Sequence, residues 1–176
     1  RWVEEFVLDL GLCPFAARPW QEGRVRVVAS RADTLAEVLA ELLDECTSLD
    51  EADPGLDEGE QDPSTSLLVL PGHLEEFDEF LDFVLAAEAL MEREGQGLRY
   101  QLVSFHPRYR FEGVPEDDPA NATNRAPWPT LQLLRRSDVR RAVREHPDIT
   151  GIPLRNMALL RAMASDAGDT GANGGP

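Results

Sequence analysis

Apolar residues recur at helical spacing in two long stretches of the chain. The first runs from Leu35 to Cys46, with apolar side chains every three or four residues. Asp33 or Thr34 can serve as its N-cap, and Glu37 completes a capping box. The second stretch, Leu74 to Met91, has a broad apolar face. We therefore expect two helices, the second of them well buried.

Three short apolar runs alternate with these helices. Val25 to Ala29, Leu67 to Leu70 and Leu98 to Phe105 are each short enough for a strand. The resulting order β-α-β-α-β is typical of parallel strands joined by right-handed crossovers. Leu131 to Leu134 indicates a fourth strand. The pattern predicts the α/β class, with a core of three to four mostly parallel strands.

Amphipathic segments at both ends complete the predicted domain. An N-terminal helix is expected from Trp2 to Leu10, ended by Gly11. Two C-terminal helices are expected, one capped by Ser137 and one over Ile152 to Met163. We predict a single domain over residues 1–164 with an acidic, mobile loop at 44–64, and a disordered tail at 165–176.

Composition narrows the classes of function. The chain of 176 residues carries a net charge of −16, which argues against general binding to nucleic acids or anionic membranes. No apolar run approaches the roughly 18 residues that cross a bilayer, and no signal peptide is visible. The two cysteines form neither a disulfide framework nor a CxxC pair. A reducing cytoplasm is the expected location.

The segment after the third predicted strand is the best candidate for a site. In open α/β sheets, ligands bind beyond the carboxyl ends of the strands, and His106 stands at such an end. The alternation of the strand places His106 on the face of Leu102 and Ser104. The long connection that follows, 108–129, contains aromatic residues and prolines. We therefore expect an ordered, functional loop.

A polar cluster inside this loop suits a small anionic ligand. It contains Asp117, Asp118, Asn121, Thr123, Asn124 and Arg125. An arginine beside amide side chains can bind a carboxylate or phosphate, because its guanidinium donates two parallel hydrogen bonds. Two structural alternatives stay open: Asn and Asp side chains that cap their own turns, and a buried pair of Arg125 with Asp118.

Cys13 is the second point of chemical interest. If Pro14 begins a short helical turn, the positive end of that turn favours a thiolate at Cys13. Cys13 and His106 could then act as nucleophile and base. The alternative is an inert, buried thiol. A zinc site of Cys13, His106 and Asp117 or Asp118 lacks a short-range ligand pair, so no metal is assigned, and the cofactor is unknown.

Four short motifs carry a resemblance to a known family. They are Gly-Leu-Cys-Pro-Phe-Ala (11–16), Ser-Phe-His-Pro (104–107), Thr-Asn-Arg (123–125) and Leu-Gln-Leu-Leu-Arg (131–135). Their order resembles the bacterial domain-of-unknown-function family DUF1415, from Trp2 to about Met163. A histidine often precedes Leu-Leu-Arg in that family; the residue here is Gln132, so a mechanism with a second histidine is not implied. The family implies no established activity.

These observations lead to three functional hypotheses. The first is a small-molecule site for an anionic ligand, with Cys13 and His106 as candidate catalytic residues. Asp118, Asn121, Asn124 and Arg125 are its candidate ligand-binding residues. The second is a non-catalytic module in which the 106–129 loop is a structural lid or docks a partner through its aromatic residues, Tyr109, Phe111 and Trp128. The third is a metal-binding protein. The sequence determines neither the substrate nor the oligomeric state.

Overall fold

The computed structural model describes residues 1–52 and 64–171, and its centre is a sheet of four strands in the order β1-β2-β4-β3. The strands are β1 (Val25–Ala29), β2 (Thr65–Val69), β3 (Tyr100–Phe105) and β4 (Thr130–Arg135). The helices before β3 are η1 (Val3–Leu8), α1 (Ala17–Gln21), α2 (Leu35–Glu51), α3 (Phe77–Arg93) and η2 (Gln96–Leu98). Those after it are η3 (Pro119–Asn124), α4 (Arg136–Glu145) and α5 (Gly151–Gly171).

The predicted α/β class is confirmed, but the prediction of a mostly parallel core is wrong. Only β1 and β2 form a parallel pair, whereas β4 lies between β2 and β3 and is antiparallel to both. The reason lies in the connection from β3 to β4. It contains only the short η3 and stays at one end of the sheet, so the chain re-enters the sheet in the opposite direction. A parallel return would need a crossover of helical length.

Three predicted boundaries also need correction. α2 continues to Glu51 and buries Leu49, so the first residues of the predicted 44–64 loop are helical; 53–63 lie outside the described residues. α5 extends to Gly171 and replaces much of the predicted 165–176 tail. The N-cap of α4 is Arg135 rather than Ser137, because β4 passes into α4 without a loop. The Thr34–Glu37 capping box of α2 is confirmed.

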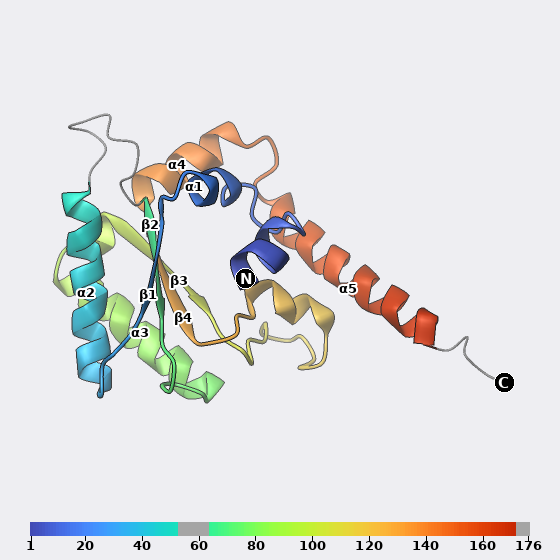
Figure 1. Cartoon of the computed structure of the whole chain (residues 1–176), viewed down its shortest axis with the longest axis horizontal. Helices are drawn as coiled ribbons and strands as arrows, with labels where there is room; N and C mark the ends of the chain where they lie inside the picture. Colours follow the sequence, from blue (N-terminus) through green and yellow to red (C-terminus); the bar gives the residue numbers. More distant parts are fainter. Residues whose placement is uncertain (53–63, 172–176) are drawn as a thin grey trace.

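The main core lies between the sheet and the pair α2 and α3. These two helices cover one side of the sheet, while η1, α1 and α5 lie on the other (Figure 1). Every second residue of the strands faces α2 and α3, as alternation requires. The core includes Leu42, Leu49, Leu68, Phe80, Leu131 and Leu133, all at most 1% exposed.

Arg135, at the junction of β4 and α4, closes the end of this core. Its guanidinium donates to the main-chain carbonyls of Leu49 and Ala52. Those carbonyls belong to the C-terminal end of α2, where a positive charge is favourable for the helix dipole. Close by, the hydroxyl of Tyr100 donates to Asp50 at 2.5 Å. The arginine of the Leu-Leu-Arg motif therefore has a structural explanation.

Phe80 and Leu85 provide a matched test of this packing, because both lie on α3. Phe80 is fully buried, whereas Leu85 is 64% exposed. We expect Phe80→Ala to lower the free energy of unfolding by about 3–5 kcal/mol, through lost burial and the cavity left behind. Leu85→Ala should change it by no more than about 0.5 kcal/mol. Denaturant unfolding followed by circular dichroism measures both; similar losses in the two variants would contradict the assigned faces of α3.

Candidate functional site

His106 lies on the predicted face, and both of its ring nitrogens contact main-chain groups. The side chain is fully buried. Nε2 lies 2.9 Å from the carbonyl oxygen of Leu74, and Nδ1 accepts the N–H of Arg108 at 3.0 Å. A neutral imidazole satisfies both contacts, with the proton on Nε2. The ring packs against Phe77 and Phe80 of α3, and burial lowers its pKa.

Asn121 holds the loop that follows β3. Its side-chain oxygen accepts the N–H of Phe111 at 2.9 Å, and its amide nitrogen donates to the carbonyls of Pro115 and Glu116. The residue is fully buried. Every hydrogen bond of this side chain is therefore to the main chain of its own loop, and the turn-capping alternative describes Asn121.

Asn124 and the loop aromatics are also engaged within the molecule. The main-chain carbonyl of Asn124 accepts the N–H of His106 at 3.1 Å, and its side chain opposes the rise that burial causes in the pKa of Tyr109. Tyr109 packs against Phe77 and Phe111. Trp128, in contrast, is 52% exposed. Tyr109 and Phe111 thus pack the loop against α3, whereas Trp128 is largely exposed.

Arg125 is fixed by the main chain of the same loop. Its Nε donates to the carbonyl of Tyr109 at 2.9 Å, and Nη2 donates to the carbonyl of Glu116 at 2.8 Å. Within residues 1–52 and 64–166, whose side chains are described, no carboxylate pairs with this guanidinium. The alternative of a buried pair with Asp118 is therefore wrong, and the charge of Arg125 is held in place without a counter-charge.

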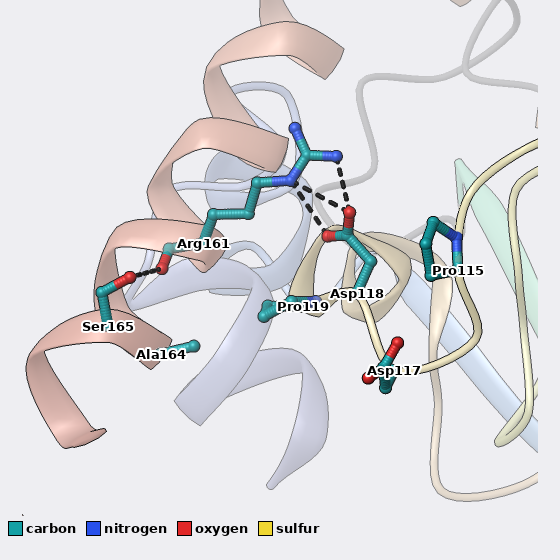
Figure 2. A pocket seen from close by; sticks show the side chains of 7 residues that line it. All are labelled: Pro115, Asp117, Asp118, Pro119, Arg161, Ala164 and Ser165. Carbon is teal, nitrogen blue, oxygen red and sulfur yellow. Dashed lines mark hydrogen bonds and ion pairs between the residues drawn. The ribbon is translucent and has the colours of Figure 1, made fainter.

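Asp118 pairs instead with Arg161 of α5. The guanidinium forms a two-pronged contact with the carboxylate, with Nη2 to Oδ2 at 2.8 Å and Nε to Oδ1 at 3.0 Å. Asp118 also caps η3 by accepting the N–H of Ala120. The Arg161 guanidinium lowers the pKa of Asp118. The pair lines an open hollow of about 460 Å³ between the loop and α5 (Figure 2).

Cys13 lies in the N-terminal segment, on the other side of the sheet from His106. Its neighbour Leu12 accepts a hydrogen bond from Asn156 of α5 at 2.6 Å, whereas the ring of His106 packs against α3. Burial raises the pKa of the Cys13 thiol, and the N–H groups of Phe15 and Ala16 only partly oppose this rise. Burial therefore disfavours the thiolate form that the short turn is predicted to favour.

The structure does not join Cys13 and His106 through any contact among the described residues. His106 cannot accept a proton from a thiol while Nδ1 is bonded to Arg108 and Nε2 to Leu74. The described residues also contain no group of three or more His, Cys, Asp or Glu side chains arranged to hold a metal ion. Arg125 lines a second hollow, and its Nη1 has no acceptor among the described residues.

That hollow was not predicted from the sequence. It has a volume of about 570 Å³ and lies between η1 and the segment that leads into β4. Its lining comprises Arg1, Trp2, Glu5, Phe6, Ala122, Arg125, Ala126 and Pro127. We call it the N-terminal hollow. Arg125 could be selected from the sequence by its residue type. The aromatic residues of η1, in contrast, indicate only an apolar helix face, and nothing in the sequence shows that this face lies beside residues 122–127.

The fold is that of a mixed α/β protein in which Arg125 lines an open surface hollow. Residues 1–169 match the model of a family described as "Protein of unknown function (DUF1415)", and the chain belongs to this family. No curated protein and no solved structure matches the chain. Within the described residues, no helix is long and apolar enough to span a membrane.

The buried imidazole of His106 predicts a pH dependence of stability. Burial lowers the pKa of His106 below its usual 6.5 in the folded protein, so the unfolded chain takes up the proton first as the pH falls. The stabilisation is complete above pH 6.5 and is lost on acidification, by at most about 1.4 kcal/mol for each pH unit.

Denaturant unfolding at a series of pH values measures this effect. Between about pH 6.5 and 5, the free energy of unfolding should fall more steeply for the wild type than for His106→Gln. The variant should also be less stable at pH 8, by about 1–3 kcal/mol, because it leaves a buried partner unsatisfied. Parallel pH profiles for the two proteins would contradict the neutral, buried state of His106.

The two roles of Asp118 can be separated by comparing both partners of its ion pair. Asp118→Ala removes the cap of η3 and the ion pair, and we expect a loss of about 1–2 kcal/mol in the free energy of unfolding. Arg161 is 48% exposed, so Arg161→Ala should cost less than about 1 kcal/mol. Thermal or denaturant unfolding checks the order; an equal or larger loss for Arg161→Ala would show that the cap contributes nothing.

Proposed function

We propose that this protein binds a small molecule with a negatively charged group and an apolar part in the N-terminal hollow. Arg125 provides the binding site for the charged group. The side chains of Trp2 and Phe6 from η1, with Ala126 and Pro127, provide the apolar surface. The volume of about 570 Å³ lies within the range of small-molecule sites.

This proposal rests on one observation: the guanidinium of Arg125 is held in place, and one of its nitrogens has no acceptor among the described residues. A surface arginine ordinarily loses side-chain freedom when it binds an anion. Here two main-chain carbonyls already hold the guanidinium, and Nη1 has no acceptor among the described residues. The entropic cost of ordering the side chain has been met by folding, so a carboxylate or phosphate binds a preorganised donor.

The partners of the other arginines strengthen the inference. Arg18, Arg99, Arg110 and Arg161 are examples of arginines whose charge is paired with a carboxylate. Arg125, Arg135 and Arg136 instead donate to main-chain carbonyls. Of these three, Arg125 lines the N-terminal hollow. The hollow between η3 and α5 is less suitable, because Asp118 already neutralises its arginine.

Calorimetric titration with benzoate and with inorganic phosphate tests the proposal. Benzoate presents a carboxylate and an aromatic ring, and phosphate presents the charge alone. We expect saturable binding of benzoate, weaker binding of phosphate, and a loss of about 10–100-fold in affinity for benzoate in Arg125→Gln. Ala122→Phe should also weaken benzoate binding, because it fills the hollow and leaves Arg125 unchanged.

Arg110→Gln is the matched control. Arg110 lies in the same loop, pairs with Asp78 and does not line the hollow, so its replacement should leave benzoate binding unchanged. Circular dichroism would confirm that each variant is folded. The proposal fails if neither probe binds the wild type, or if folded Arg125→Gln and Ala122→Phe both bind benzoate as the wild type does.

A further inference from the structure

The strand β1 forms one edge of the sheet, with its main-chain groups turned alternately toward and away from β2. The N–H of Ser30 donates to Val69 of β2 at 2.8 Å, and the carbonyl of Arg24 accepts from Ser64, also at 2.8 Å. Even-numbered residues therefore direct their main-chain groups toward β2. Odd-numbered residues direct theirs outward.

Val25, Val27 and Ala29 accordingly present N–H and C=O groups on the outer edge. Among the described residues, no main-chain hydrogen bond reaches these groups from that side. A free edge of this kind is a template for another strand, and proteins usually protect it with a proline, a bulge or outward charges. β1 has no proline, and its register with β2 is continuous. Its one charged residue, Arg26, is paired with Glu45 of α2, and Val27 is 54% exposed.

We propose that β1 pairs antiparallel with β1 of a second copy of this chain, about a two-fold axis at Val27. Val27 is the middle residue of β1, so this axis keeps the whole strand paired. Val27 then lies opposite its own copy, and Val25 opposite Ala29. These are the residues with outward main-chain groups, so each pair exchanges hydrogen bonds in both directions. The result is one sheet that continues across both copies.

Charge complementarity favours a second copy as the occupant of this edge. The axis places Arg26 of each copy opposite Val28 of the other, so no like charges face each other directly. Arg26 donates through Nε to Glu45 of α2 and is 45% exposed, which leaves its outer nitrogens available. The side chain therefore lies on the face of the sheet that α2 covers.

Glu41 gives the second copy's Arg26 a partner. It lies one helical turn before Glu45, and α2 runs back along β1, so a turn of about 5.4 Å corresponds to about two residues of strand. Glu41 therefore lies near Val28. One oxygen of Glu41 accepts the N–H of Arg31 at 3.2 Å, and among the described residues no arginine forms an ion pair with this carboxylate. In the dimer, the arginine opposite Val28 supplies a positive charge beside this carboxylate.

Two features of the chain determine how the pairing must be tested. Each copy has a net charge of −16, so the mass is measured at about 0.15 M salt, where the Debye length is about 8 Å. α5 also exposes apolar side chains, with Leu154 at 70% and Leu159 at 36%. Nothing in the structure shows what would cover α5, so that helix serves as the competing interface in the test.

Light scattering after size exclusion, over a series of protein concentrations, measures the dimer. Val27→Lys places two positive charges side by side on the axis, and we expect its dimer dissociation constant to rise at least about 10-fold, with unchanged circular dichroism. Val27→Thr is the matched control, because it keeps the β-branched shape and the main-chain N–H, and it should remain dimeric. The amide of Val27 should exchange its hydrogen more slowly in the dimer than in the monomer.

Three results would overturn the proposal. The first is a wild type that stays monomeric at every concentration. The second is a folded Val27→Lys variant that dimerises as the wild type does. The third is a dimer that survives Val27→Lys and is lost in Leu159→Glu, which would assign the interface to α5.

Discussion

The imidazole of His106 connects two loops at one end of the sheet, and the order of both loops depends on it. It joins the carbonyl of Leu74, before α3, to the N–H of Arg108, after β3. Leu74 is the one non-glycine residue of the described chain with a positive φ, 57°, a conformation that costs about 1–2 kcal/mol. The hydrogen bond to His106 helps to offset this cost. A residue whose position suggested catalysis is therefore the structural link between two loops.

Three arginine side chains order other connections in the same way, by donating hydrogen bonds to main-chain carbonyls. Arg125 connects the carbonyls of Tyr109 and Glu116, Arg135 caps the end of α2, and Arg136 donates to the carbonyls of Gly97 and Tyr100. The guanidinium suits this use because it carries five donors on a rigid plane and is always charged. Long connections are thereby ordered through polar contacts, without the large apolar area that a second core would require.

Local pattern and long-range contact differ in how far the sequence predicts them. Periodicity and capping located all four strands and the long helices, and alternation placed His106 on the correct face. The position of β4 was not predictable, because strand order depends on pairing between distant segments. The same limit applies to His106 and Asn121: their residue types suit chemistry or structure equally, and the choice depends on whether Leu74 or Pro115 lies within hydrogen-bond distance. Arg125 could be selected by type, whereas the contribution of Trp2 to its hollow could not.

The central place of β4 has a consequence for biosynthesis. Of the four strands of the described sheet, β4 is the last to leave the ribosome, yet it lies between two strands made earlier. Until Arg135 has emerged, β2 and β3 each keep an open edge, and the apolar side chains that β4 covers remain accessible. The nascent chain therefore passes through a period in which it is vulnerable to wrong pairing. The non-local pairing of β2 with β4 also predicts slower folding than helical proteins of this size show.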